Sequence, residues 1–325
     1  MKKVFSTRLG RYLVGSIDDR TTKNFLLENY EGRVQLILTS PPFPLNAKKE
    51  YGNLTGSKYK EWFAGLAPLF SRLLKKDGSI IIEIGNAWEP KKPIQSLLPL
   101  ESLMYFVQHP KARLRLCQEF ICYNPARLPS PAQWVTVDRI RVTDSYTRVW
   151  WMAKSDNPKA DNSRVLRPYS KSMQDLLKSG TYNAGRRPSE HVIGGKSFLK
   201  NNKGSIMHNV IPLETFEGEN VLRLPKNVLR FANTSSNDYF SNECRRREIQ
   251  PHPARMPLGL ASFFVEFLTD PGDIVLDPFA GTNTTGYCAE KLGRGWVAIE
   301  IDPKYGKQSV IRLRDPLLKS RLKLF

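Results

Sequence analysis

Short runs of apolar residues alternate along much of the chain with longer segments in which apolar residues recur every three or four positions. The runs at 34–38, 79–85 and 274–277 predict buried strands that are covered on both faces. A periodic segment such as 58–75 predicts a helix with one apolar side. Strands that alternate with helices predict an α/β fold with a doubly wound, mostly parallel, Rossmann-like sheet.

The remaining segments extend this order in both directions. Further strands are expected at 11–18, 116–122, 146–153 and 295–301, and further helices at 20–29, 97–107, 258–269, from about 286 to 291, and in the tail. The strands at 116–122 and 146–153 are expected to be antiparallel, at the far edge of the sheet.

The sequence pattern changes between residues 154 and 250, where the periodicity of apolar residues is weak and Gly, Asn, Ser and basic residues are frequent. The pattern predicts a smaller, loop-rich domain at 154–250 between two parts of one larger domain, 1–153 and 251–325. A disordered linker is the alternative. The apolar residues that favour a small core instead are Val192, Ile193, Phe198, Val210, Ile211, Val221, Leu222, Leu224 and Phe231.

The charge of the chain points to an acidic, extended partner. Its 325 residues include 50 Lys and Arg against 31 Asp and Glu, a formal net charge of +19. Because the basic residues are spread over the chain and form no amphipathic helix, nucleic acid is favoured over a membrane surface. A merely soluble basic protein is the alternative.

No apolar stretch is long enough for a membrane span, and none follows the basic start as in a signal peptide, so an intracellular protein is expected. The four cysteines form no CxxC pair and have no histidine cluster nearby, so neither a zinc site, nor another metal site, nor a disulfide framework is expected.

The first candidate site is the turn after the buried strand 34–38. Thr39 and Ser40 carry hydroxyls, Pro41 and Pro42 supply no N–H, and Phe43 adds an aromatic ring. Such a turn is poor for anions, which favour backbone N–H groups, but it offers acceptors and a π face to a neutral planar molecule with an amino group. A proline-rich turn with a core phenylalanine is the alternative.

The second candidate site follows the strand 274–277. Asp277 ends that strand, Gly281 and Gly286 lie in the next turn, and Glu300 ends the following strand, 23 positions after Asp277. An acidic residue roughly 20 positions after the first strand is suited to bind the ribose hydroxyls of a nucleotide. The glycine spacing G-x-G-x-x-G, which would allow a pyrophosphate to approach the backbone, is missing. A cofactor with adenosine and no phosphate, such as S-adenosylmethionine, fits better. A Rossmann turn without a ligand is the alternative.

These two motifs resemble those of amino-methylating DNA methyltransferases. The segment 39–43 resembles their catalytic S-P-P-[YF] motif, and 277–286 resembles their cofactor motif. The catalytic motif comes first, the basic region second and the cofactor motif last, which resembles the beta arrangement of the family. Residues 252–257 resemble the element before the cofactor strand, with Met256 where the family more often has Lys.

The resemblance implies an S-adenosylmethionine-dependent methyltransferase that modifies N4 of a cytosine flipped out of duplex DNA. Ser40 and the Pro41 carbonyl would accept hydrogen bonds from the amine, and Phe43 would stack on the base. The catalytic residues implied are Ser40, Pro41, Pro42, Phe43 and Glu83, and the cofactor-binding residues are Asp18, Asp277, Phe279, Gly281, Thr282, Thr284 and Glu300.

Glu83 interrupts a buried strand and is expected to accept a hydrogen bond from Ser40, with an exposed carboxylate at the strand end as the alternative. No cysteine follows a proline, which excludes the cytosine-C5 mechanism.

The segment 154–250 is expected to read the DNA sequence. The basic residues expected to contact DNA are Arg186, Arg187, Lys196, Lys203, Arg245, Arg246 and Arg247. The resemblance implies a short palindromic site such as CAGCTG, a monomeric enzyme, a bacterial cytoplasmic setting and a partner restriction endonuclease from which the mark protects host DNA. The rival functions are adenine-N6 methylation, RNA methylation and DNA binding without catalysis.

Overall fold

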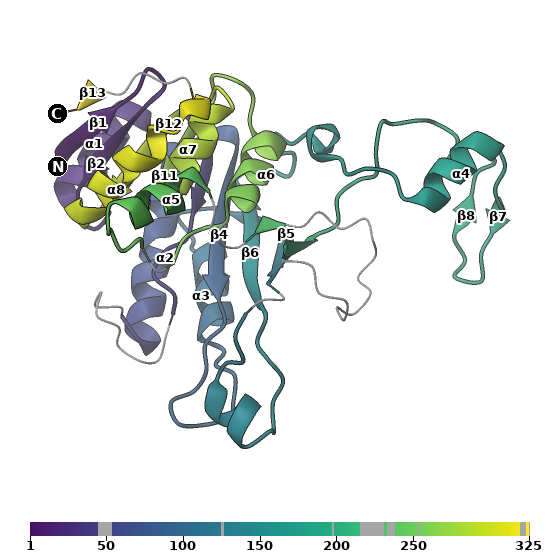
Figure 1. Cartoon of the computed structure of the whole chain (residues 1–325), viewed down its shortest axis with the longest axis horizontal. Coiled ribbons are helices and arrows are strands. Elements are labelled where there is room, and N and C mark those ends of the chain that lie inside the picture. The colour runs from purple at the N-terminus through teal and green to yellow at the C-terminus, as the bar shows by residue number, and fades with distance from the viewer. Residues whose placement is uncertain are drawn as a thin grey trace.

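The computed structural model describes residues 1–44, 54–124, 127–196, 198–214, 231–232, 238–252, 254–318 and 323–324. One large sheet runs through it (Figure 1) and contains β1 (Lys2–Ser6), β2 (Gly10–Val14), β3 (Val34–Thr39), β4 (Leu74–Gly85), β5 (Arg115–Tyr123), β6 (Tyr146–Ala153), β9 (Val210–Glu214), β10 (Phe231–Ala232), β11 (Ile274–Asp277), β12 (Gly295–Glu300) and β13 (Lys323–Leu324). The short strands β7 (Gly185–Arg186) and β8 (Val192–Ile193) pair separately.

The helices are α1 (Arg20–Tyr30), α2 (Gly56–Leu73), α3 (Leu98–Val107), α4 (Lys171–Ser179), α5 (Tyr239–Arg246), α6 (Leu258–Leu268), α7 (Thr284–Lys291) and α8 (Pro303–Leu313). Three shorter turns of helix are η1 (Gln133–Val137), η2 (Asn162–Val165) and η3 (Pro316–Leu318). Within the described ranges, none of the helices has the length and apolar character needed to span a bilayer.

The sheet has the order β10-β9-β5-β6-β4-β3-β11-β12-β2-β1-β13. Its centre, from β4 to β2, is parallel, whereas β6 pairs antiparallel with both β4 and β5. The predicted α/β class, the parallel core and the antiparallel edge are thus confirmed. The strands β1, β9, β10 and β13 were not predicted, because segments of two to five residues are too short to show a periodicity.

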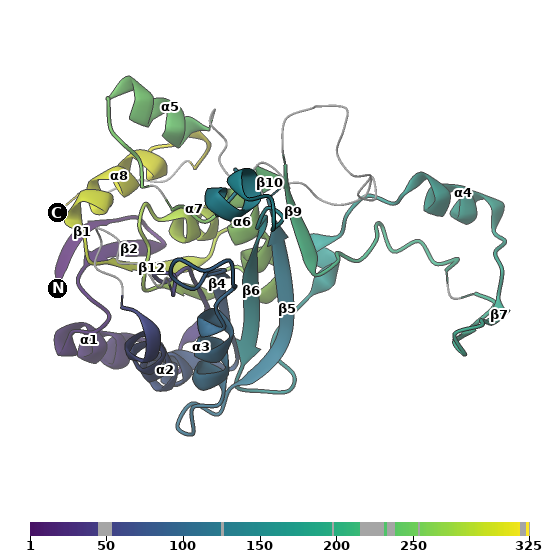
Figure 2. The ribbon, with the colours of Figure 1, turned by 90° about the horizontal axis from the view of Figure 1, so that it is seen from below.

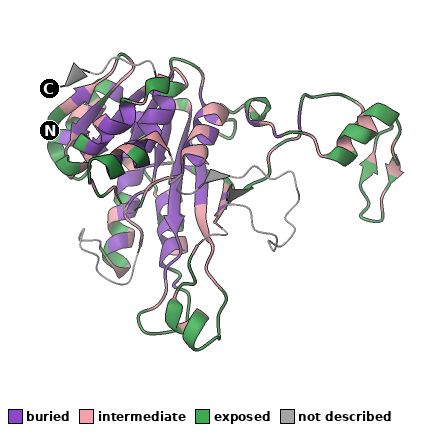
Figure 3. Ribbon diagram, viewed as in Figure 1, coloured by how far each residue is buried: buried purple, intermediate pink, exposed green. Residues whose placement is uncertain are grey.

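Helices cover both faces of the sheet, with α1, α2 and α3 on one face and α6, α7 and α8 on the other (Figure 2). Side chains of the central strands alternate between the two layers. Ile80 and Ile82 pack with the first set of helices and Ile81 with the second. Every residue of β3 is buried (Figure 3), as expected for a strand covered on both sides.

Some parts of the segment 154–250 pack on the main body, and other parts extend away from it. Residues up to Val165 lie against the main body, and α4, β7 and β8 lie on an arm that extends away from it (Figure 1). Farther on, β9 joins the sheet beside β5, and α5 packs on α8. The small core suggested by the sequence is wrong where the structure describes it, because Val192, Phe198 and Val210 are exposed. Residues 221, 222 and 224 lie outside the described residues.

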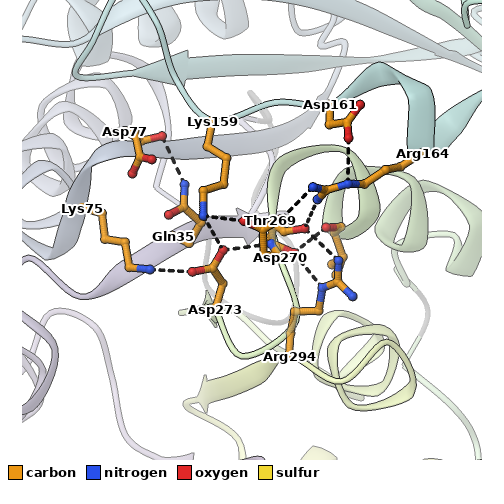
Figure 4. Close-up of polar contacts among 11 residues, drawn as sticks. Gln35, Lys75, Asp77, Lys159, Asp161, Arg164, Thr269, Asp270, Asp273 and Arg294 are labelled. Atoms are coloured by element: carbon orange, nitrogen blue, oxygen red, sulfur yellow. Dashed lines mark hydrogen bonds and ion pairs between the residues drawn. The ribbon is translucent and has the colours of Figure 1, made fainter.

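A network of charges fixes the start of this segment to the body (Figure 4). Lys159 Nζ lies 2.9 Å from Asp270 Oδ2 and 3.0 Å from Asp273 Oδ2. Arg164 and Arg294 both donate to the Thr269 carbonyl. Because Asp273 and Arg294 directly precede β11 and β12, the network lies at the amino ends of the parallel strands. It therefore lies at the edge of the sheet opposite both candidate turns.

Candidate active site

The two candidate turns lie side by side at the carboxyl ends of β3 and β11. These strands are parallel neighbours, with Ile37 opposite Leu276. The hydroxyl of Thr39 donates to Oδ1 of Asp277 at 2.7 Å, and that of Thr285 donates to Oδ2 at 2.8 Å. From β3 the chain moves through α2 to β4 on one side, and from β11 through α7 to β12 on the other. The turns therefore meet at the topological switch point, where α/β proteins bind ligands.

The Ser40–Phe43 turn is held by three contacts from two elements, β4 and α2. The Ser40 hydroxyl donates to the main-chain carbonyl of Glu83 at 3.4 Å. The buried Tyr59 of α2 donates to the Pro42 carbonyl at 2.7 Å. The Phe43 ring lies over Gly85, where an added Cβ would come within 2.6 Å of its carbons. Tyr59 and Gly85 are positioning residues that the sequence did not reveal.

Glu83 is buried, with 7% of its surface exposed, so the alternative of an exposed carboxylate is wrong. Its carboxylate accepts a hydrogen bond from Thr147 Oγ1 at 3.0 Å, and the Ser40 hydroxyl contacts the main chain of Glu83 rather than its side chain. Burial raises the pKa of Glu83 to about 7, although Thr147 and the nearby Arg127 oppose that shift. The carboxyl group can therefore gain or lose a proton near neutral pH.

The second candidate turn, residues 278–286, which we call the cofactor turn, has unusual backbone geometry at two residues. Gly281 has a φ of +48°, and Asn283 has a φ of +62°, which asparagine tolerates better than most residues. Asn283 caps α7 by accepting a hydrogen bond from Gly286 N at 3.1 Å. A Cβ at Gly286 would come within 2.2 Å of the Asn283 side chain, so the cap and Gly286 depend on each other.

Two predicted acids hold this turn through its backbone. Glu300 Oε2 accepts from Gly281 N at 2.8 Å, and Asp277 Oδ1 also accepts from Phe279 N at 3.1 Å. Burial raises the pKa of Asp277 to about 6, against its three hydrogen-bond donors, and burial also raises the pKa of Glu300. In the described residues neither carboxylate forms an ion pair.

A buried arginine lies behind the same turn. Arg312 of α8 is only 3% exposed, and its Nε donates to the Thr282 carbonyl at 3.0 Å. Its guanidinium lies 4.2 Å from the ring centroid of Phe240 in α5. Burial lowers the pKa of Arg312 to about 10. Arg312 was not predicted from the sequence, because nothing local links position 312 to position 282.

Asp18 and Phe279 are linked by an aromatic side chain from α2. Trp62 Nε1 donates to the two carboxylate oxygens of Asp18 at 2.9 and 3.0 Å. Its ring makes an edge contact with Phe279, at 5.8 Å between centroids. The sequence placed Trp62 only on the apolar side of a helix. In the fold it brings Asp18, from the end of the β2 segment, to the cofactor turn.

The segment 252–257 also lies at the cofactor turn. The His252 ring lies near Gly281, 3.9 Å from where a Cβ would stand, and contacts the Tyr305 ring at 4.3 Å between centroids. Met256 packs against the apolar cluster of α6 and α7. Its side chain thus takes part in the core. Thr284, the first residue of α7, is also buried.

The predicted DNA-binding residues fall into two groups. Arg186, Arg187 and Lys196 lie on the arm, and Lys203 follows in the exposed chain after it. Arg245, Arg246 and Arg247 stand at the end of α5, which packs on α8. Both Arg246 and Arg247 pair with Glu243 at 2.8 Å. The structure therefore does not bring the seven residues into one surface, and their contacts with DNA stay a prediction.

Comparison with known proteins decides the family. A family model described as DNA methylase matches residues 34–310, which include both turns and the segment between them. The chain belongs to the DNA methylase family. It is 38% identical over 293 residues to the Type II methyltransferase M.PvuII of Proteus hauseri, covering 89% of this chain and 81% of that protein.

Solved structures agree with this assignment. The methylase is similar to the PvuII DNA methyltransferase (cytosine-N4-specific), with a TM-score of 0.71, 30% identity, and coverage of 97% of this chain and 90% of that chain. It shares its fold with a putative DNA modification methylase from Thermus thermophilus complexed with S-adenosyl-L-methionine, with a TM-score of 0.50, 18% identity and 94% coverage of both chains. The methylase is thus an enzyme that methylates DNA, built on the methyltransferase fold.

Proposed function

We propose that this enzyme transfers a methyl group from S-adenosylmethionine to the exocyclic N4 of a cytosine in duplex DNA. The observation that carries the proposal is the contact between the two turns, in which Thr39 donates to Asp277. It joins an amine-binding turn to a cofactor turn within one site. A protein that only bound DNA would have no use for both.

The cofactor turn suits a cationic, phosphate-free ligand. Asp18, Asp277, Glu300 and Asp302 lie around it, and the described part of the chain supplies no ion pair to any of them. Burial is the main cause that raises the pKa of both Asp277 and Glu300. The negative charge of Glu300 further raises the pKa of Asp277, and that of Asp302 further raises the pKa of Glu300. This is a negative site in a chain of net charge +19.

A positive ligand would relieve that repulsion, whereas a phosphate would increase it. When bound, S-adenosylmethionine supplies an electrophilic methyl group on positively charged sulfur. Asp18 and Glu300 are the acids that would hold its adenosine, and Phe279 the aromatic neighbour.

The Ser40–Phe43 turn suits the amine of a base. The lone pair of cytosine N4 is delocalised into the ring, so the amine attacks a methyl group only when it becomes pyramidal. The Ser40 hydroxyl and the Pro41 carbonyl would accept its hydrogens and stabilise that geometry. Phe43, supported by Gly85, would stack on the flipped base. Such stacking contributes about 1–3 kcal/mol, comparable with the few kcal/mol that flipping costs.

Cytosine is proposed rather than adenine for two reasons. Serine stands at position 40, where an adenine-N6 enzyme would be expected to carry Asp or Asn. The chain is also similar over nearly its whole length to a methyltransferase described as cytosine-N4-specific. Adenine-N6 methylation is the alternative, because the same turn can accept hydrogen bonds from any exocyclic amine.

The setting proposed is a bacterial restriction-modification system. M.PvuII is described as a Type II methyltransferase, and it is 38% identical to this chain. We infer a short palindromic target, with CAGCTG as the first sequence to test, a monomeric enzyme in the cytoplasm, and a restriction endonuclease that acts on the same site without forming a stable complex.

The test is methylation of random-sequence duplex DNA with S-adenosylmethionine that carries a labelled methyl group. The product is digested to nucleosides, and the modified base and its flanking sequence are identified. N4-methylcytosine in a palindromic context is the expected product. Label found in N6-methyladenine alone would overturn the cytosine assignment, and an equal rate on duplex RNA would overturn DNA as the substrate.

A further inference from the structure

Two loops leave the sheet on the side where the parallel strands have their carboxyl ends, which is also the side of the Ser40–Phe43 turn. β4 ends there at Gly85, opposite Thr147 of β6. β5, which runs antiparallel to β6, ends at the same edge, with Tyr123 opposite Tyr146. Residues 86–97 and 127–145 therefore both lie beyond the catalytic edge. We call them the projection, and they form the lowest part of the molecule in Figure 1.

Specific contacts join the two loops of the projection. Asn86 Nδ2 donates to Asp144 Oδ1 at 2.8 Å, and Arg141 Nε donates to the Pro93 carbonyl at 2.9 Å. The rings of Trp88 and Trp134 lie 5.6 Å apart. These bonds and the aromatic contact give the projection a defined shape outside the main core.

The projection exposes an unusual amount of apolar surface. It carries six of the seventeen large apolar side chains that are exposed in the described part of the chain, namely Ile94, Leu97, Leu128, Val137, Ile140 and Val142. Leu128 is 80% exposed and Val142 is 87% exposed. Figure 3 shows the projection as mostly exposed. Several exposed apolar side chains on one projecting part of a protein indicate a surface that binds a partner.

Exposed cations accompany these apolar residues. Lys91, Lys92 and Arg139 are exposed, and none forms an ion pair with a described residue. At the base of the projection Arg127 donates to the Tyr146 carbonyl at 3.1 Å and lies close enough to Glu83 to oppose the rise in its pKa. The base of the projection therefore lies beside the proposed active site, with Arg127 near Glu83 on one loop and Gly85 next to Phe43 before the other.

We propose that the projection is a second DNA-binding element, separate from the arm, that holds the duplex beside the flipped base. This inference rests on the proposed function, in which a base of the duplex must reach Ser40. Lys91, Lys92 and Arg139 bind phosphates, and the exposed apolar side chains of the projection, among them Leu128 and Val142, lie against the groove. Apolar side chains are used in this way by proteins that hold distorted DNA.

The charge part of the proposal is tested by the double variant Lys91→Gln/Lys92→Gln. Its control is Lys76→Gln/Lys111→Gln, which removes two exposed lysines near the opposite edge of the sheet. Binding to a fluorescein-labelled random-sequence duplex is measured by anisotropy between low and moderate salt. We expect roughly tenfold weaker binding and a salt slope lower by about one per lysine for the projection variant alone. Equal behaviour of the two double variants would overturn the proposal.

The apolar part is tested by Leu128→Ser/Val142→Ser, for which we expect slower methylation of plasmid DNA with an unchanged salt slope. Cofactor affinity should equal that of the wild type in every variant, which shows that the fold is kept. A dimer seen in sedimentation and lost in this variant, with unchanged methylation, would assign these two apolar residues to a contact with a second copy and overturn the proposal. Because duplex binding is measured without methyl transfer, a wrong assignment of the modified base would leave this result standing.

Discussion

The hydroxyl of Thr39 donates a 2.7 Å hydrogen bond to the carboxylate of Asp277, 238 positions later in the chain. Thr39 ends β3 and is followed by the turn that we propose binds the base, and Asp277 ends β11 and is followed by the turn that we propose binds the cofactor. Both side chains are buried. The bond therefore fixes the two halves of the proposed active site relative to each other.

Replacing Thr39 by valine should loosen that connection. Asp277 would keep two of its three donors but lose the one on the base-binding side, at a cost of about 1–3 kcal/mol. We expect a lower free energy of unfolding in guanidinium titrations and weaker cofactor binding by calorimetry. Thr39→Ser, which retains the hydroxyl, is the control and should stay near the wild type in cofactor affinity. A fully stable valine variant would show that the bond has no structural role.

Ser40→Ala should lower turnover and leave cofactor affinity nearly intact. The substitution removes a hydrogen-bond acceptor for the amine, worth about 1–3 kcal/mol, or roughly a tenfold to hundredfold loss in kcat. Single-turnover methylation of duplex DNA measures the effect, and calorimetry of the cofactor is the internal control. An unchanged rate would remove Ser40 from the mechanism.

Gly85→Ala should act on the base through Phe43. The new methyl group would lie 2.6 Å from the ring carbons, so the ring must move from its position. We expect a loss of roughly tenfold in turnover, equivalent to about 1.4 kcal/mol. Gly65→Ala is the matched control, because a Cβ at that exposed helical site meets nothing within 4 Å. Equal turnover in the two variants would contradict a supporting role for Gly85.

Glu83 should make stability depend on pH. Its pKa is about 7 in the folded protein and 4.5 as the ordinary value, so folding favours the protonated form. This contribution is fully present below pH 4.5 and is lost as the pH rises through 7, which amounts to on the order of 3 kcal/mol. Glu83→Gln should therefore gain stability relative to the wild type between pH 5 and pH 8. The free energies of unfolding of the two proteins are measured by titration at pH 5 and at pH 8. The same difference between variant and wild type at both values would refute the raised pKa of Glu83.

Arg312→Met should weaken cofactor binding by releasing the Thr282 carbonyl from its buried donor. The side chain touches neither reacting group, so we expect KM for the cofactor to rise about tenfold while kcat at saturation stays close to the wild type. Arg314→Met, on an exposed residue just after the same helix, is the control. A fall in kcat with unchanged KM would contradict this role.

Local pattern was sufficient to predict the central strands and both turns. The runs that became β3 and β11 are mostly apolar, with Gln35 the one polar residue inside them, and the hydroxyl, proline and glycine residues that follow leave few alternatives to a turn. Their proximity also followed from chain order, since parallel strands on either side of a switch point expose their carboxyl ends together.

Tyr59, Trp62 and Arg312 could not be predicted as site residues from sequence. Each lies on an ordinary amphipathic helix and reaches the site only through packing between distant elements. The orientation of Glu83 had the same limitation, because its partner Thr147 comes from a strand 64 positions away. The Arg245–Arg247 run offered a local signal that was missed, since Glu243 stands at the spacing of an ion pair within one helix.

The pairing of β3 with β11 also has a consequence for synthesis of the enzyme. A growing chain that ends before residue 274 contains the complete base-binding turn but leaves one edge of its central strand unpaired. The strand β11 at 274–277 fills that position, and the cofactor turn follows it directly. A product that ends before residue 274 therefore lacks both the partner strand of β3 and the cofactor turn, and we expect it not to methylate DNA.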